Sequence, residues 1–421
     1  NKRATPLPVR LVASGDARVQ IDHTADFILA PGEARTITAS YRCAGDAPQL
    51  DISHWRPQPT PQVTTWLLLD EDELSLGSGL HYEPAAAITT HPSPITLVPG
   101  VAQTILVQVK NQLDRPMQGE LQIVNAAGLT TSWQRTNFQV DALGHASAAL
   151  ELKSDHADEI ALAIVATFVD EGQLITTAPQ SLPVLVRSLG QVAAIAHHPD
   201  PAKTTVYVEN DFFFGGCIQR EGRMWLANKA GEEYEINLQE MLGPPYTPYE
   251  FEQKDYAITL YKTSGRVEIN LAIDSTNFPG VQLGRQIIVS SSPLVEVRQW
   301  LHNTGAMVHT CKVLTSLHLP DNFAVNGQTA MPRRERLVTA MSNLIPEVEG
   351  DFPKLPAELA EQWIAHANAG LVHGVVWHQD VTEHEWRPWF FDLFSAQPAI
   401  LPHPRVDLSP IYLYCGPGDW R

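Results

Sequence analysis

Hydrophobic and polar residues alternate along much of this chain, and the alternation is clearest over residues 267–274. Val267, Ile269, Leu271 and Ile273 are aliphatic, and most of the residues between them are polar. A period of two places successive side chains on opposite faces of a β-strand. The pattern therefore predicts a strand that buries one face.

The same alternation continues through residues 285–320, which we expect to form consecutive strands. Two valines alternate with Glu296 and Arg298 in this stretch. Asn303-Thr304-Gly305 then supplies a turn, because Gly and Asn tolerate positive φ at little steric cost. A second apolar run over residues 308–319 follows at once, so the segment predicts antiparallel strands joined by tight turns.

One segment, residues 356–369, has the pattern of a helix instead. It begins with a proline, carries Glu358 early, and places Leu359 and Trp363 four residues apart on one helical face. Proline at the first turn and early acidic residues suit the start of a helix, and Gly370 follows as a stop signal. We therefore expect an all-β chain with one short helix.

Strand spacing divides the chain into three predicted domains. Residues 1–88 and 89–188 carry short strands at the spacing typical of immunoglobulin-like β-sandwiches, and residues 204–421 carry a dozen or more strands. Residues 189–205 are expected to be a linker in which His197-His198 is exposed. Ala30-Pro31-Gly32 to Ile37 is echoed by residues 98–105, which favours two copies of one sandwich plan, although chance similarity of two turn-plus-strand units stays open.

Two resemblances follow from these patterns. The segment that continues through Asn111 to Pro116 (NQLDRP) resembles bacterial immunoglobulin-like modules that flank carbohydrate-active catalytic domains. The run from Val295 through Leu301-His302-Asn303-Thr304-Gly305 to His318, with Trp363 and the 370–377 strand, resembles the galactose-mutarotase-like supersandwich. That fold occurs in sugar epimerases, polysaccharide lyases and the C-terminal halves of α-mannosidase-like glycoside hydrolases. The resemblance therefore implies a fold and a glycan or oligosaccharide partner, without specifying an activity.

Composition narrows the range of partners. The chain has 421 residues, 32 of them Pro, and 29 Lys+Arg against 47 Asp+Glu give a net charge of −18. An acidic chain with no basic stripe is a poor partner for nucleic acid. No apolar run approaches the roughly 20 residues that span a bilayer, so we expect no membrane contact. Since the first residue is Asn, we expect a portion of a longer protein whose other domains are partners.

The cysteines bear on redox state and location. Cys43, Cys217, Cys311 and Cys415 are far apart and form no C-x-x-C pair, which excludes a zinc knuckle or a dense disulfide framework. Reduced, partly buried thiols are expected, and one disulfide between distant strands stays open. We favour a cytoplasmic over a secreted location.

The densest group of reactive side chains lies in residues 373–391 and mixes histidines, acids and aromatics. Such a mixture suits a sugar, because aromatic faces stack on the apolar face of a pyranose while charged groups bind its hydroxyls. The predicted ligand-binding residues are Trp377, His378, Asp380, Glu383, His384, Trp386, Arg387 and Trp389. The alternative interpretation is a sandwich rim whose aromatic residues cover the core.

Other chemistries are less well supported by the sequence. Four of these residues could be considered as metal ligands (His378, Asp380, Glu383 and His384), but their spacing matches no H-E-x-x-H helix, so we expect neither a metal nor another cofactor. An epimerase needs a histidine acid facing a carboxylate base, and His309, His318 and Glu296 are possible players. Three hypotheses stay open: a non-catalytic glycan-binding portion of a larger carbohydrate-active protein, a sugar-acting enzyme of the epimerase or glycoside hydrolase type, and an interaction scaffold.

Overall fold

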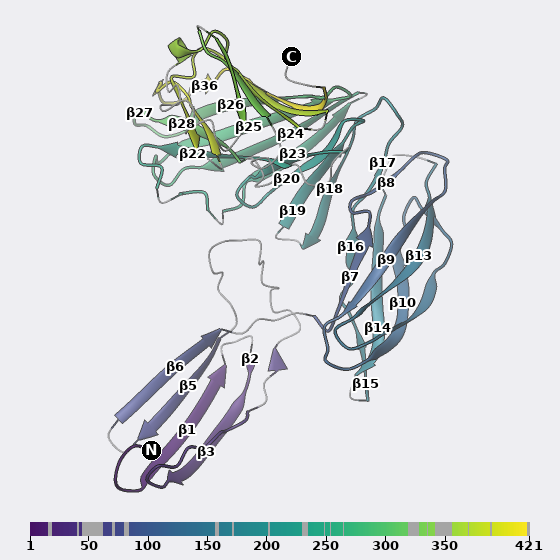
Figure 1. The fold of residues 1–421 in the computed structure, drawn as a ribbon, viewed down its shortest axis with the longest axis vertical. Helices are drawn as coiled ribbons and strands as arrows, with labels where there is room; N and C mark the ends of the chain where they lie inside the picture. The colour runs from purple at the N-terminus through teal and green to yellow at the C-terminus, as the bar shows by residue number, and fades with distance from the viewer. Residues whose placement is uncertain are drawn as a thin grey trace. The chain divides into compact units, whose positions relative to one another are not determined.

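A computed structural model describes most of the chain and shows an almost entirely β-strand protein (Figure 1). The described residues are 1–15, 19–39, 42–43, 62–69, 72–79, 84–155, 160–170, 172–200, 203–229, 235–247, 249–252, 254–263, 265–318, 328–334, 336–341, 356–368, 370–387 and 390–418. The all-β class predicted from the alternation is confirmed. No helix among these residues is long and apolar enough to cross a membrane.

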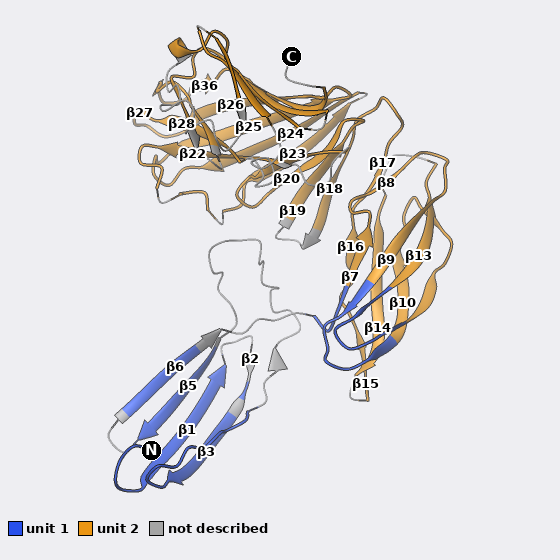
Figure 2. Cartoon of the chain, viewed as in Figure 1, with its two compact units in different colours: residues 1–87, 109–118, 139–146 blue, residues 88–108, 119–138, 147–421 orange. Residues whose placement is uncertain are grey.

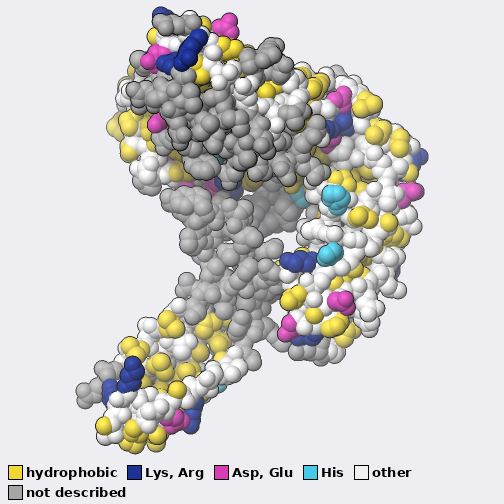
Figure 3. Space-filling view, viewed as in Figure 1, with side chains coloured by type: hydrophobic (Ala, Val, Ile, Leu, Met, Phe, Trp, Pro, Cys, Tyr) yellow, Lys and Arg dark blue, Asp and Glu magenta, His cyan; other side chains and the backbone are white. Residues whose placement is uncertain are grey.

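The chain divides into two compact units (Figure 2). The first comprises residues 1–87, 109–118 and 139–146, and the second comprises residues 88–108, 119–138 and 147–421. On the face shown in Figure 3, the described Lys and Arg side chains are scattered among Asp and Glu side chains. Charge on this face is therefore mixed and is not gathered into a patch of one sign.

The N-terminal residues form an antiparallel sheet with strand order β3-β1-β5-β6. Its strands are β1 (Leu7–Gly15), β3 (Asp22–Leu29), β5 (Gln62–Leu69) and β6 (Asp72–Gly79), with a small pair formed by β2 (Val19–Gln20) and β4 (Arg42–Cys43). The predicted turn at Pro31-Gly32 is confirmed, with Gly32 at a φ of 78°. The strand that the echo predicts after this turn is wrong for residues 36–39, which carry no strand. The echo with residues 98–105 is thus a shared turn.

Residues 86–186 form two antiparallel sheets and a short parallel pair. One sheet contains β10 (Met117–Asn125), β12 (Arg135–Val140), β14 (Leu162–Asp170), β15 (Gln173–Thr176) and β16 (Gln180–Leu182). The other contains β7 (Ala86–His91), β9 (Gln103–Asn111), β11 (Thr130–Thr131) and β13 (His145–Lys153), while β8 (Ile95–Leu97) pairs with β17 (Val184–Val186). Val107, Leu121, Leu150 and Ile164 are fully buried, as the period of two predicts. Membership of the immunoglobulin-like class stays a prediction.

The remaining residues form two large antiparallel sheets. The eight-stranded sheet has the order β18-β19-β20-β21-β22-β28-β34-β33. Its strands are β18 (Ala193–Asp200), β19 (Lys203–Glu209), β20 (Phe213–Ile218), β21 (Met224–Asn228), β22 (Glu235–Gly243), β28 (Lys312–His318), β33 (Glu383–Arg387) and β34 (Phe390–Phe394). Residues far apart in the sequence, on β22 and β28, therefore lie side by side.

The ten-stranded sheet follows the order β23-β24-β25-β26-β37-β32-β31-β29-β30, with β36 paired to β26. Its strands are β23 (Ala257–Thr263), β24 (Arg266–Asp274), β25 (Val281–Ser290), β26 (Leu294–Asn303), β29 (Gln328–Pro332), β30 (Leu337–Met341), β31 (Trp363–Asn368), β32 (Leu371–Val376), β36 (Arg405–Asp407) and β37 (Ile411–Pro417). A separate pair is formed by β27 (His309–Thr310) and β35 (Ala399–Ile400). The predicted strands at 267–274 and 294–303 are confirmed.

One hydrophobic core joins the two large sheets. Alternate residues of both contribute to it, for example Leu238 on β22, Leu317 on β28 and Ile269 on β24. The intervening residues of the eight-stranded sheet face away from this core, because side chains alternate along a strand. We call this side of the eight-stranded sheet the outer face; it carries Asn237, Gln239, Ser316, His318 and Asp392.

The predicted helix over residues 356–369 is wrong. Only Pro356–Glu358 forms a single 3-10 turn (η2), and Trp363–Asn368 is strand β31. β31 lies between β29 and β32, and Ile364, Ala365 and His366 are consecutive and all buried, so both faces of this strand are covered. The i, i+4 spacing of Leu359 and Trp363 resembles a helix, but pairing with neighbouring strands overrides this local preference.

The predicted linker over residues 189–205 is also wrong. Ala193–Asp200 forms β18 at the edge of the eight-stranded sheet, paired with β19. His197 was expected to be exposed and is buried, because it packs against Tyr207 with ring centroids 6.1 Å apart. Small alanines in this segment suit a strand as readily as a linker, so composition alone could not distinguish a linker from a strand here.

Candidate functional site

Of the predicted sugar-contacting residues, the five whose side chains the structure describes are divided between the core and more exposed positions. Trp377 and His384 are buried in the core, where their rings lie 5.7 Å apart and both pack on Phe391. Burial lowers the pKa of His384 to about 4, so this ring is neutral at physiological pH. Both side chains are buried, so neither is exposed to a ligand at the surface of this sheet.

The other predicted residues lie elsewhere. His378 and Asp380 are partly exposed and bonded to one another, with 3.1 Å between Nδ1 and Oδ1. Glu383 lies on the edge strand β33, where it forms an ion pair with Lys312 at 3.7 Å. The side chains of Trp386 and Arg387 and the whole of Trp389 lie outside the described part of the chain, so their ligand-binding role stays a prediction.

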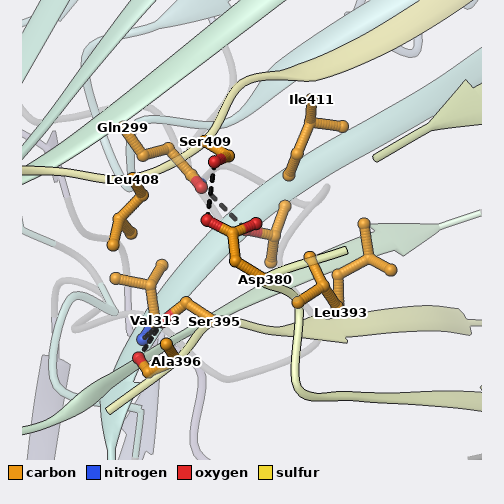
Figure 4. Close-up of a pocket in the computed structure, with 11 residues that line it drawn as sticks. Gln299, Val313, Asp380, Leu393, Ser395, Ala396, Leu408, Ser409 and Ile411 are labelled. Carbon is orange, nitrogen blue, oxygen red and sulfur yellow. Dashed lines mark hydrogen bonds between the residues drawn. The ribbon is translucent and has the colours of Figure 1, made fainter. Parts of the chain in front are cut away.

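Asp380 lines a small cavity between the two large sheets (Figure 4). Ser409 points toward Asp380 and donates a hydrogen bond to its Oδ2 at 2.6 Å. Gln299 and Thr315 line the same cavity and are joined at 2.8 Å. Its volume is about 30 Å³, and a water needs roughly 10–15 Å³. The cavity therefore has room for about two waters and not for a sugar.

A buried ion pair lies beside this cavity. Gln299 donates to Oε1 of Glu240 at 3.0 Å, and the other carboxylate oxygen of Glu240 lies 2.6 Å from Nη1 of Arg285. Both charged side chains are 1 % exposed. Arg285 also donates to the carbonyl of Gly222. Since Glu240 belongs to β22 and Arg285 to β25, the pair joins the two sheets and has a structural role.

A larger polar pocket lies on the eight-stranded sheet. It has a volume of about 70 Å³ and is lined by Arg223, Asn237, Leu238, Gln239 and His318. Of these, Leu238 belongs to the core cluster, whereas the other four supply polar groups and are only partly buried. It is larger than the cavity at Asp380 and is lined mainly by polar side chains, four of its five lining residues, so we take it as the candidate binding site.

Strand register explains why these residues meet. Asn237 is the cross-strand partner of both Trp225 on β21 and His318 on β28, and Gln239 is the partner of Ser316. Asn237 and Gln239 are two residues apart, so they share the outer face of β22. Directly opposed side chains on a sheet lie about 4.5–5.5 Å apart at Cβ, which brings groups 81 positions apart in sequence into one pocket.

Aromatic side chains adjoin the pocket along the same row. Trp225 is partly exposed, and its ring lies over Gly216, where a Cβ would come within 3.2 Å of the indole nitrogen. Tyr207 and Phe214 hold the ring edge-on, with centroid distances of 6.3 and 5.5 Å. The absence of a side chain at Gly216 thus lets the indole lie against the sheet, next to Asn237.

Two carboxylates, Asp392 and Glu385, lie on the outer face in the strands that follow β28 in the sheet. Asp392 on β34 is the cross-strand partner of Ser316, which donates to its Oδ1 at 2.6 Å, and Glu385 is the next partner on β33. Burial and, after it, the guanidinium of Arg223 lower the pKa of His318 to about 4. The imidazole is therefore neutral at pH 7 and can both donate and accept a hydrogen bond.

The other possible epimerase residues have different surroundings. His309 bonds through Nε2 to the carbonyl of Pro279 at 3.0 Å, and its ring packs edge-on against Phe278. Glu296 binds Arg298 at 2.7 Å on β26 of the other sheet. Of the three, His318 is the one that lines the polar pocket described above.

The cysteines and possible metal ligands offer no reactive centre in the described part of the chain. Cys217, Cys311 and Cys415 are free and buried, as predicted for these three, and burial raises the pKa of their thiols to about 11, 12 and 12. The side chain of Cys43 lies outside the described residues. No group of three or more His, Cys, Asp or Glu among those described is arranged to hold a metal ion.

Sequence reasoning found His318 but missed Arg223, Asn237 and Gln239. Asn237 and Gln239 belong to an ordinary alternating strand and Arg223 directly precedes one, and nothing local separates the three from solvent-facing residues. Polar residues do alternate with apolar ones over residues 235–241, but this alternation indicates a binding site only once the pairing of β22 with β21 and β28 is known. The ligand site was instead predicted from residues that are contiguous in sequence, such as residues 373–391, and the strand topology does not support that choice.

Comparisons with known proteins give structural likeness only. No family model and no curated protein matches the chain. Galactose 1-epimerase from Lactobacillus acidophilus is 8 % identical, with 55 % of this chain and 100 % of that chain covered and a TM-score of 0.38. A candidate aldose 1-epimerase from Escherichia coli K12 is 8 % identical, with 51 % and 99 % covered and a TM-score of 0.34.

A third solved structure has a different description. A TPR-domain containing protein from Parabacteroides distasonis is 9 % identical, with 61 % of this chain and 50 % of that chain covered and a TM-score of 0.38. Likeness at these TM-scores carries no argument about function, because one fold hosts many unrelated activities. The functional argument therefore depends on the pocket itself.

Proposed function

We propose that the outer face of the eight-stranded sheet binds a carbohydrate. The observation that carries this proposal is the pocket of Arg223, Asn237, Gln239 and His318 beside the partly exposed indole of Trp225. Amides, an imidazole and a guanidinium suit the hydrogen-bonding groups of a sugar, while an indole face suits its apolar face. A small number of polar groups beside an aromatic surface is the usual composition of a small-molecule site.

The wider assignments made from the sequence remain part of this proposal. The chain would serve as a glycan-binding portion of a larger carbohydrate-active protein, with a mutarotase-like sandwich preceded by immunoglobulin-like modules. The ligand would enter from the outer face, whereas the water-sized cavity at Asp380 would play no part in binding. The scaffold hypothesis becomes the outcome in which no sugar binds.

Calorimetric titration of the full chain with a panel of mono- and oligosaccharides tests the proposal. Removing Gln239 as Gln239→Ala should weaken binding by about 2- to 10-fold, because one hydrogen bond contributes roughly 0.5–1.5 kcal/mol. Gln282→Ala is the matched control: Gln282 is also a strand glutamine, but it bonds to Asp274 on the other sheet. Binding of no sugar by a folded chain, or equal losses in both variants, would refute the proposal.

A sugar-acting enzyme is the second candidate, and one observation favours it. His318 is neutral and shares the outer face with Asp392 and Glu385, two carboxylates on the neighbouring strands. A neutral imidazole and a carboxylate on one face are what general acid–base chemistry on a sugar needs. If this candidate is right, the chain turns over aldoses and His318→Gln abolishes turnover while retaining binding. No turnover at high protein concentration excludes it.

A further inference from the structure

The groups that line the polar pocket are mostly hydrogen-bond donors. Arg223 has five N–H groups and accepts nothing, each of Asn237 and Gln239 offers two N–H groups and one carbonyl acceptor, and no carboxylate is among the described residues of the lining. A hydroxyl needs both a donor and an acceptor around it, whereas an acidic group accepts only. The excess of N–H groups over acceptors, together with the positive charge of Arg223, therefore favours an anionic oxygen group over sugar hydroxyls alone.

The size of the pocket points to a substituent and not to a whole sugar ring. About 70 Å³ is room for roughly five water-sized volumes, which suits a group of three to five heavy atoms. A pyranose attached to that group would then lie outside the pocket. The indole of Trp225, which adjoins Asn237 in the next strand, is the apolar surface available to it.

We propose, building on the carbohydrate function above, that the ligand is an acidic sugar whose carboxylate or sulfate enters this pocket and is bound by Arg223. The planar guanidinium donates two parallel hydrogen bonds to such a group. Glu221 competes for one end of Arg223, with 3.7 Å between Nη2 and Oε2. A single carboxylate at that distance leaves the other N–H groups of Arg223 available to the ligand.

Charge further restricts the ligand to one with few acidic groups. The chain carries a net charge of −18, and Asp392 and Glu385 share the outer face near His318. A long polyanion would be repelled by this field, whereas one acidic group inserted beside Arg223 meets the local positive charge. We infer that an isolated or terminal acidic unit is preferred over a uniformly acidic polymer.

Matched sugars test this inference by calorimetric titration of the full chain. The probes are galacturonate and galactose 6-sulfate against galactose, and glucuronate against glucose, with inorganic sulfate as a further arm. Each acidic sugar should bind about 10-fold or more tightly than its neutral partner, because hydrogen bonds to charged groups are roughly twice as strong as neutral ones. The uronate and sulfate arms identify which acidic group is preferred.

Arg223→Met removes the charge and keeps an unbranched apolar stem. It should bring acidic and neutral sugars to the same affinity, while Arg298→Met, the matched control at an exposed Arg–Glu pair of the other sheet, should leave the preference intact. Equal binding of acidic and neutral sugars by the unchanged chain overturns this inference but leaves carbohydrate binding standing. Binding of neither class by a folded chain overturns both, and binding of inorganic sulfate as tightly as the acidic sugars shows an anion site with no sugar selectivity.

Discussion

The ion pair of Glu240 and Arg285 gives a sharp test of how the two sheets are held together. Both side chains are 1 % exposed, and Arg285 reaches from β25 to a carboxylate on β22 with 2.6 Å between the charged atoms. Burial alone would lower the pKa of Arg285, but the adjacent Glu240 carboxylate more than offsets this and raises it. The guanidinium is therefore charged and depends on Glu240.

Glu240→Gln keeps the shape of the side chain and removes its charge. The charge of Arg285 would then be buried without compensation, and breaking such a pair typically costs about 3–5 kcal/mol. Gln299, which donates to Oε1 of Glu240 at 3.0 Å, would also lose a charged acceptor. We expect the free energy of unfolding to fall by that amount, measured by urea titration followed by tryptophan fluorescence with linear extrapolation.

Glu296→Gln is the matched control for this experiment. Glu296 pairs with Arg298 at 2.7 Å, but on the surface, with the Arg side chain 47 % exposed. Exposed pairs typically contribute about 0.2–1 kcal/mol. Equal losses for Glu240→Gln and Glu296→Gln would refute the view that desolvation makes Arg285 dependent on its partner. The double variant Glu240→Leu/Arg285→Met should be more stable than Glu240→Gln, because it leaves no buried charge.

Two further predictions concern stability. Burial lowers the pKa of three core histidines to about 3, 4 and 4 (His366, His373 and His384). Their neutral forms are favoured in the folded state, so their contribution to the free energy of unfolding should be complete above about pH 6.5 and should be lost as the pH falls toward 4. For three groups the free energy of unfolding should fall by up to roughly 4 kcal/mol per pH unit. A urea midpoint that is unchanged between pH 7 and 5 would contradict this. Gly284→Ala should cost about 1–3 kcal/mol, because its Cβ would overlap the indole of Trp300, whereas Gly77→Ala, with open space around it, should cost little; thermal unfolding of both variants decides.

Much of the strand architecture could be predicted from the sequence. The alternation over 267–274 and 294–303 set which side chains face the core, because a strand in a half-buried sheet has a side-chain period of two. Turn residues were equally informative: Gly32 and Gly100 both adopt positive φ after a proline, at 78° and 73°. These features are local, so the chain specifies them without reference to distant residues.

Local pattern failed where burial on both faces removed the alternation. Residues 356–369 combined a proline start with Leu359 and Trp363 at helical spacing, yet Trp363–Asn368 is a strand enclosed by β29 and β32. Trp377 and His384 were chosen because they are near polar neighbours in sequence, but both lie in the core. Composition could not show this, since the same residues occur in cores and in sugar sites.

The candidate site depends on strand register. Arg223 lies directly before β21, Asn237 on β22 and His318 on β28, and only the pairing of β22 with β21 and β28 brings them to one pocket. The sequence by itself indicated a strand over residues 308–319, which include His318, but it did not indicate the strand β22 that carries Asn237 and Gln239. The tertiary structure decided which polar residues on the opposite face become neighbours, because contacts between strands depend on long-range pairing that the local pattern does not encode.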